Sequence, residues 1–260
     1  MAAITIDDII TSLENIIAES ITANSRLGYF AALYLKVTKS VKDGIASGQF
    51  QDGPRMEKLD VIFASRYLMA YDQWKKHQEP TGSWAVAFEQ AEKSSVLVLQ
   101  HLLLGMNAHI NLDLGIAAVE VCGDQPIATL QQDFDDINTI ISALTNQVLF
   151  ELGRVSPLLS LLGLHATNYN SALIQFSISN ARDGAWCFAE DLAQKKDDAY
   201  TQCIVQRDAT IKQLAESLVH TTGVMRFTIW LIHVFEWKSP SDIIKTLNEY
   251  VKKKIAVNKA

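Results

Sequence analysis

Apolar residues recur at intervals of three and four along almost the whole chain, the spacing that places them on one face of an α-helix. In one segment, for example, Leu59, Phe63, Tyr67 and Trp74 would form a single apolar stripe. The chain has only five prolines and twelve glycines, and no segment has a run of residues typical of strands. The pattern therefore predicts an all-α protein, folded as a single compact multi-helix bundle over residues 1–260.

Residues that start and stop helices divide this pattern into segments. Thr5 and Asp8 offer a cap and an acidic first turn at the first start, and Pro240 after Ser239 places a proline in the first turn of the last helix. The first helix could lie at the periphery of the bundle. The expected helices cover approximately residues 5–22, 26–47, 54–77, 84–93, 94–114, 128–152, 168–194, 198–220, 224–235 and 240–254.

One of these helices is almost free of charge but is not a continuous apolar run. No charged residue occurs from 94 to 112, yet histidines, asparagines and a glutamine interrupt the leucines. The uncharged segment 155–181 is interrupted in the same way. We therefore predict buried helices of a large soluble core and no transmembrane segment.

The polar residues of this helix fall on two separate stripes when they are placed at about 100° per residue. Gln100, Asn107 and Asn111 lie close together on one stripe. Buried polar groups cost free energy unless they are paired. We expect this first stripe to join the helix to its neighbours.

The second stripe carries the candidate chemistry. It contains His101, Gly105, His109 and Asp113. His109 and Asp113 are four residues apart, so Asp113 could orient His109 or raise its basicity, as in a general base. Gly105 would let another backbone or a ligand approach closely. The alternative is that these groups only satisfy neighbouring helices in a polar seam.

Metal binding is a further interpretation of the same stripe. His101, His109 and Asp113, with a residue from another helix, could hold one divalent ion such as zinc and leave an open position for water. The sequence does not decide whether a cofactor is present.

Two arginines lie within apolar patterns, Arg66 and Arg182. A buried guanidinium is costly unless it finds a carboxylate or the anionic group of a ligand. Asp60 and Asp113 are the candidate carboxylate partners. The arginines would therefore either join helices through structural bridges or hold an anion.

Charge and cysteine content limit the partners and the cellular compartment that we expect for this protein. A net charge of −6 argues against a nucleic-acid partner. Cys122, Cys187 and Cys203 lack the spacing of a structural zinc site and are most simply reduced thiols. The N-terminus is acidic where a signal peptide would be basic, so we predict a cytoplasmic protein. The oligomeric state stays open.

Common catalytic motifs are absent from the sequence. It contains no GxSxG, P-loop, HExxH or GxGxxG after a strand, and no pair of Glu-x-x-His motifs typical of di-iron bundles. These absences exclude the most recognisable chemistries.

Several blocks occur in a characteristic order: RLGYFAALYLKVTKSV, LDVIFASRYLMAYDQW, QHLLLGMNAHINLDLGIA, DFDDIN, RVSPLLSLL and ARDGAW. Together they resemble an uncharacterised bacterial family that is known only as a domain of unknown function. The resemblance runs from about Arg26 to the C-terminal helix and implies a mainly helical domain without an established activity. It directs attention to Arg66, His101, His109, Asp113, Asp133, Asn138, Arg182 and Trp186.

A second similarity concerns one helix. The pattern Gly105-x-x-x-His109-x-x-x-Asp113 is similar to the His-x-x-x-Asp element of the zinc-dependent phospholipase C and nuclease family, which is also all-α. The chain lacks that family's N-terminal tryptophan ligand and its repeated elements. A site with three zinc ions is therefore not expected.

Two classes of function are consistent with these features. The first is an enzyme, hydrolase-like, that acts on a small or amphipathic substrate in a buried pocket. His109, oriented by Asp113, would act there as a base or metal ligand, and Arg66 or Arg182 would hold an anionic group. The alternative is a non-catalytic binding or scaffold protein whose apolar interior accepts a lipid-like or aromatic small molecule, or a partner helix.

Overall fold

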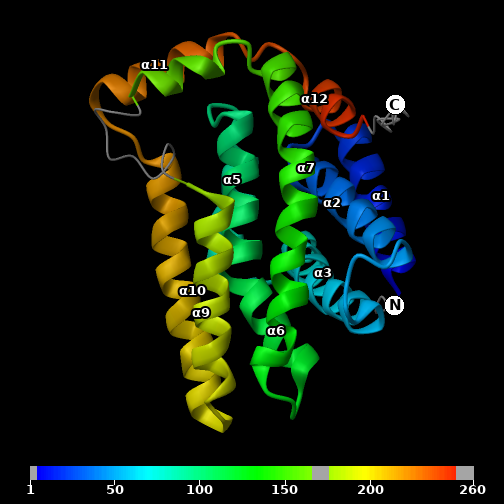
Figure 1. Ribbon diagram of the computed structural model, residues 1–260. Helices are drawn as coiled ribbons and strands as arrows, with labels where there is room; N and C mark the ends of the chain where they lie inside the picture. The colour runs from blue at the N-terminus through cyan, green and yellow to red at the C-terminus, as the bar shows by residue number, and fades with distance from the viewer. Residues whose placement is uncertain (1–4, 166–175, 250–260) are drawn as a thin grey trace.

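The computed structural model describes residues 5–165 and 176–249, in which all regular elements are helices and no strand occurs (Figure 1). The all-α prediction is confirmed. The α-helices are α1 (Ile6–Thr22), α2 (Gly28–Ala46), α3 (Gly53–Lys75), α4 (Gly82–Ala91), α5 (Val98–Ala108), α6 (Gly115–Cys122), α7 (Gln131–Val155), α9 (Ile178–Ala193), α10 (Asp197–Val219), α11 (Gly223–Val234) and α12 (Pro240–Leu247). Shorter elements are the π-helix η1 (His109–Leu114) and the 3₁₀-helices η2 (Ile127–Leu130) and η3 (Leu159–His165).

The predicted helix starts are formed by the expected capping residues. At α1 the Thr5 amide donates to Asp8 Oδ2 at 3.0 Å, and the Asp8 amide donates to Thr5 Oγ1 at 3.2 Å. At α12 the Asp242 amide donates to Ser239 Oγ at 3.1 Å. These bonds satisfy amides that have no partner within their own helix.

The predicted helix 94–114 differs most from the structure. It begins later, at Val98, because the Leu97 amide donates to the Gln100 side chain and the Val98 amide donates to Glu236. It does not end at Leu114 but continues through η1 into α6. The predicted residues 168–175 and 250–254 lie outside the described part of the chain.

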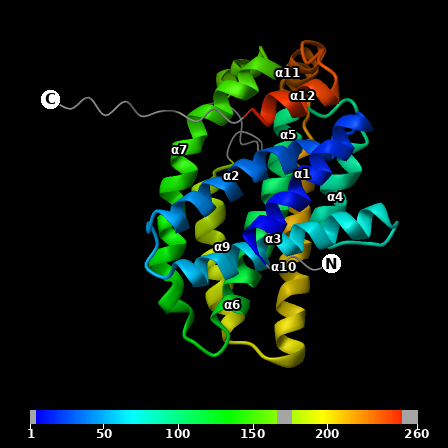
Figure 2. The same cartoon turned by 90° about the vertical axis from the view of Figure 1, so that its right-hand side faces the viewer.

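The continuous stretch α5–η1–α6 forms the centre of the fold. Figures 1 and 2 show it enclosed by the other helices, and it contacts α2, α3, α4, α7, α9 and α10. Among the described residues it is the one helical stretch long and apolar enough to cross a membrane, and 89% of its most apolar window is buried inside the protein.

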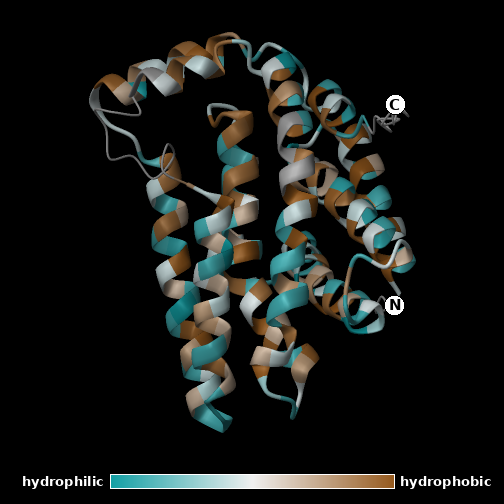
Figure 3. Cartoon of the chain, in the orientation of Figure 1, coloured by the Kyte–Doolittle hydropathy of each residue, from teal (hydrophilic) through white to brown (hydrophobic). Residues whose placement is uncertain are grey.

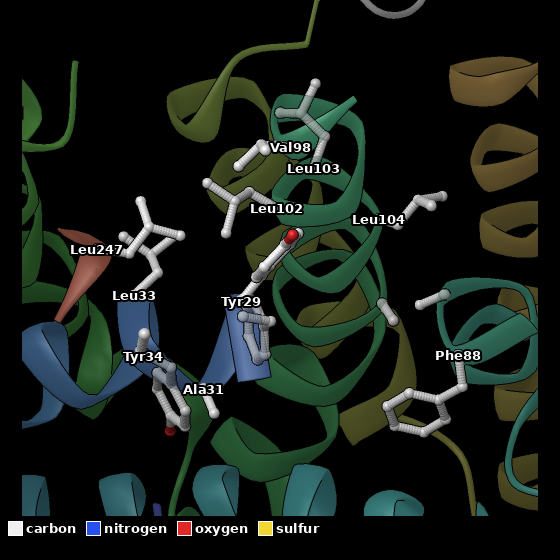
Figure 4. Close-up of a cluster of buried hydrophobic side chains, with 14 of the residues drawn as sticks. Tyr29, Ala31, Leu33, Tyr34, Phe88, Val98, Leu102, Leu103, Leu104 and Leu247 are labelled. Carbon is white, nitrogen blue, oxygen red and sulfur yellow. The ribbon is translucent and has the colours of Figure 1, made fainter. Parts of the chain in front are cut away.

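The main apolar core lies between this central stretch and the N-terminal helices. Figure 3 shows apolar residues along α5, whereas α9 and α10 carry many hydrophilic ones. In Figure 4, Leu102 of α5 lies near Tyr29 and Leu33 of α2. Helix α1 contributes to the same core with Ile9 and Leu13, both fully buried.

The first polar stripe joins helices, as predicted. Gln100 Nε2 donates to the Leu218 carbonyl at 2.8 Å, and Asn107 Nδ2 donates to the Ile211 carbonyl at 2.9 Å. Asn111 Nδ2 donates to Asn107 Oδ1 at 3.0 Å. The amides therefore fasten the central stretch to α10 by way of backbone carbonyls.

Gly105 permits a close approach, but of an aromatic side chain from α2. A Cβ atom at this position would lie 2.4 Å from Cδ2 of Phe30, far inside van der Waals contact. The sequence predicted a neighbouring backbone or a ligand at this position.

Replacing Gly105 with alanine is expected to lower the free energy of unfolding by about 1–3 kcal/mol, because Phe30 would have to move within a packed core. Urea denaturation followed by circular dichroism measures this. The matched control is Gly153→Ala, since Gly153 is exposed in α7 and a Cβ there meets no atom within 4 Å. It should leave stability unchanged or raise it by up to about 1 kcal/mol. Equal effects of the two substitutions would contradict the packing argument.

Candidate functional site

The Asp113 carboxylate lies at the centre of the candidate site and is held by two helices. Arg66 Nε of α3 donates to Oδ1 at 2.9 Å, and Trp84 Nε1 of α4 donates to Oδ2 at 2.8 Å. Asp113 is only 1% exposed. Of the two carboxylates that the sequence offers to the arginines, Asp113 is the one that pairs with Arg66. The buried anion thereby joins α3, α4 and η1.

His109 lies beside this anion within a group of aromatic rings. Its Nδ1 atom is 3.6 Å from Asp113 Oδ2, which is close enough for an ion pair but too long for a hydrogen bond. The ring stacks on Phe63 with 3.5 Å between centroids and meets the edge of Tyr34 at 4.4 Å. The other ring nitrogen, Nε2, has no hydrogen-bond partner among the described residues.

The charge state of His109 follows from these surroundings. Burial lowers the pKa of His109 below its ordinary value of 6.5, and Asp113 partly opposes this change. The ring is therefore neutral at physiological pH. It can offer a lone pair or an N–H group to a ligand, but not a positive charge.

The π-helix η1 sets the direction of these side chains. Its wider turn begins at His109, and Arg207 Nε of α10 donates to the Asn111 carbonyl within it at 2.9 Å. A regular spacing of 100° per residue therefore does not continue beyond His109. The sequence indicated a uniform α-helix here and missed both the π-helix and the role of Arg207.

His101 does not join His109 and Asp113. It lies against the edge of the Tyr29 ring and lines a separate small cavity, and Phe30 stands between the two, lining both cavities. No group of three His, Cys, Asp or Glu side chains in the described residues is arranged to hold a metal ion. The three predicted metal ligands thus do not form a common ligand set, because the ring that packs on Gly105 separates them.

A long apolar cavity opens next to His109. It has a volume of about 230 Å³ and lies between α2, α3, the α5–η1 stretch, α7 and α9. Its lining extends from Leu99 to Leu114 on the central stretch, which corresponds to about 20 Å along a helix. Leu149 of α7 also lines it and is 57% exposed, so the cavity reaches the surface there.

The described lining residues include only four with polar side-chain groups: Tyr34, Asp60, His109 and Arg182. Asp60 is 7% exposed, and its Oδ2 atom has no partner among the described residues. Burial raises the pKa of Asp60 from 3.8 to about 7, and nearby Glu57 adds to the effect. Asp60 is not the partner of either arginine, although the sequence offered it as one.

Arg182 is more deeply buried than Arg66, and its hydrogen bonds go to uncharged groups. Nε donates to Asn138 Oδ1 at 2.6 Å, Nη2 donates to the Phe134 carbonyl, and the guanidinium lies 4.4 Å from the centre of the Phe134 ring. No Asp or Glu side chain of the described residues is within ion-pair distance of Arg182. Burial lowers the pKa of Arg182 to about 10.

Two other residues from the recognisable blocks lie in structural positions. Asp133 accepts the amides of Gln51 and Asp52 at 2.6 and 3.1 Å and thereby holds the loop before α3. Trp186 packs against Phe134 with 4.9 Å between ring centroids. Trp186 thus supports the ring that lies against Arg182, and neither Asp133 nor Trp186 is among the described residues that line the cavity.

Comparison with known proteins adds a family but no activity. The profile of a family of unknown function, DUF5995, matches residues 6–221. The chain belongs to this family. No protein of curated function and no solved structure matches the chain. The match covers α1 through α10, and therefore includes the whole neighbourhood of Asp113 and the cavity.

Sequence reasoning missed some of the residues that define the site. Trp84 as a donor to Asp113, and Phe63 and Tyr34 as ring neighbours of His109, come from helices distant in the chain. A signal for Asp60 was present, because an aspartate interrupts the apolar run LDVIFAS. The pattern alone gives no direction for that carboxyl group.

Replacing Asp113 with asparagine is expected to lower the free energy of unfolding by about 3 kcal/mol, because it removes the anion that Arg66 and Trp84 face. Chemical denaturation measures the change. Asp72→Asn is the matched control, since its pair with Lys76 is exposed and should contribute at most about 1 kcal/mol. A loss for Asp113→Asn no larger than the control's would contradict a central role for this carboxylate.

Asp60 and His101 predict opposite pH dependences of stability. The raised pKa of Asp60 means that the folded protein loses stability relative to an Asp60→Asn variant as pH rises from about 4 to about 7, by at most about 1.4 kcal/mol per pH unit. Burial lowers the pKa of His101 to about 3, so the folded protein loses stability relative to His101→Gln as pH falls from 6.5. Unfolding curves of the three proteins across pH 4–7 test both signs. Parallel pH profiles would contradict the burial argument.

Proposed function

We propose that this protein binds an elongated, largely apolar small molecule in the cavity beside His109. The single observation that carries the proposal is the cavity itself. Its volume of about 230 Å³ exceeds the ~150 Å³ that lets an apolar protein cavity hold benzene. Its lining residues are spread along the central stretch from Leu99 to Leu114, so a chain-like molecule suits it better than a compact one.

The walls of the cavity support this proposal because they are fixed and mostly apolar. Lys36 of α2 and Glu151 of α7 form a buried ion pair that holds two of the walls together. Tyr34, Asp60 and His109 supply a small polar region among aliphatic side chains. A few polar groups in a mainly apolar pocket are typical of small-molecule binding sites.

Binding without catalysis is the function that these residues favour. No serine, threonine, cysteine or lysine is among the described residues lining the cavity, so the nucleophiles of the hydroxyl, thiol and amine kinds do not face it. Both oxygens of Asp113 already accept hydrogen bonds from Arg66 and Trp84. Asp113 therefore serves to hold these helices together.

A hydrolase-like enzyme is the second candidate function, and one observation favours it. His109 lines the cavity with an unpartnered Nε2 atom, while Nδ1 lies 3.6 Å from a carboxylate. A neutral imidazole arranged in this way could act as a general base toward a water molecule. Such a reaction would need no covalent intermediate.

Filling the cavity with a larger side chain should weaken the binding of apolar molecules. We expect the neutral dye Nile red to bind the parent protein and to be displaced by 1-tetradecanol, and we expect Leu144→Trp, within the α7 wall, to weaken both at least tenfold. Fluorescence titration measures both affinities, and circular dichroism checks the fold. Met69→Trp is the matched control, because Met69 is 54% exposed and outside the lining. Unchanged binding by Leu144→Trp would overturn the proposal.

An activity assay on the parent protein and on a His109→Gln variant discriminates between the two candidate functions. Incubation with a long-chain p-nitrophenyl ester is expected to give no turnover above the uncatalysed rate if the cavity only binds. Turnover that disappears in His109→Gln, with Nile red affinity retained, would instead favour the enzyme.

A further inference from the structure

We infer that Arg182 binds the anionic head group of the cavity's ligand, and that this ligand is a long-chain carboxylate. The inference rests on the proposed function, since it specifies what the proposed cavity would hold. It depends on a different observation, which is that the buried Arg182 has no ion-pair partner among the described residues.

Arg182 is buried and Arg66 partly buried, and their charges are balanced differently. Asp135 and Asp183 act on Arg182 electrostatically, but neither forms an ion pair with it. Arg66 lies 2.9 Å from Asp113 and 3.7 Å from Glu120, so two carboxylates already balance it. Arg182 is 3% exposed, lines the cavity, and has no Asp or Glu of the described residues within ion-pair distance. A buried charge without a counterion is costly unless something else supplies one.

The surroundings of Arg182 hold the guanidinium in place for such a ligand. Asn138 and the Phe134 carbonyl accept two of its N–H groups, and the Phe134 ring lies against the guanidinium plane. These contacts restrict the side chain without neutralising it. A guanidinium fixed in this way is suited to a planar carboxylate, which it can bind through parallel hydrogen bonds.

The charges of the lining favour a singly charged head group. Arg182 is the one cationic side chain in the described lining, and Asp60 lines the same cavity. A carboxylate adds one negative charge to a lining that already contains Asp60, whereas a doubly charged phosphate monoester would add two. Ile178 is one turn before Arg182 on α9 and lines the cavity as well, so an apolar chain can continue directly from the head group.

Comparing ligands that share a chain but differ in charge tests this inference. We expect the parent protein at pH 7.5 to bind tetradecanoate at least about tenfold more tightly than 1-tetradecanol, because a hydrogen bond to a charged group is stronger than one between neutral groups. Tetradecylammonium should bind more weakly than the alcohol. In Arg182→Gln the preference for the acid should disappear while alcohol affinity is retained. Arg226→Gln, at an exposed arginine of α11, is the matched control and should keep the preference. Competition against Nile red reports all of these affinities.

Each result bears on either the inference or the proposed function. Equal affinity of the parent for acid and alcohol would overturn the inference and leave the binding function standing, whereas no binding of either would overturn both. If Arg182→Gln does not fold, Asn138→Ala replaces it, because it removes the acceptor that orients Arg182. That variant should reduce the preference for the acid at least threefold, and an unchanged preference would overturn the inference.

Discussion

The buried carboxylate of Asp113 is the interaction on which the arrangement of this protein most depends. An anion this far from water is stable only where donors surround it. Arg66 and Trp84 provide those donors from two different helices, so the charge fixes α3 and α4 against the central stretch. His109 lies beside this anion, with Nδ1 3.6 Å from Oδ2, and its ring stacks on Phe63.

The central stretch can meet this requirement because it is not a uniform α-helix. Phe30 packs against Gly105, where there is no side chain. The helix then continues as the wider π-helix η1, which contains both His109 and Asp113. Phe30 therefore divides the polar stripe in two, with His101 on one side and His109 on the other. The residues that the sequence placed on one stripe therefore lie in two separate environments. Of the two histidines, His109 lines the larger cavity and His101 the smaller one.

The charged groups around that cavity differ in how well they are balanced. Lys36 and Glu151 neutralise one another and hold opposite walls together. Asp60 can avoid its charge by binding a proton, since its pKa lies near neutrality. Arg182 has no ion-pair partner among the described residues, and with a pKa of about 10 its guanidinium stays charged at physiological pH. Arg182 therefore differs from the other charged groups around the cavity.

The sequence by itself determined the helical class, most helix boundaries and the role of the amide stripe, because periodicity, capping residues and hydrogen-bonding capacity are local properties. It also singled out Arg66, His109, Asp113 and Arg182. Only the tertiary structure decided which of them meet. Arg66 and Asp113 are 47 positions apart, and Arg182 and Asn138 are 44 apart, so no local spacing encodes their contact. The cavity, the separation of His101 from His109 and the surroundings of Arg182 arise from the packing of whole helices, which a one-dimensional pattern does not contain.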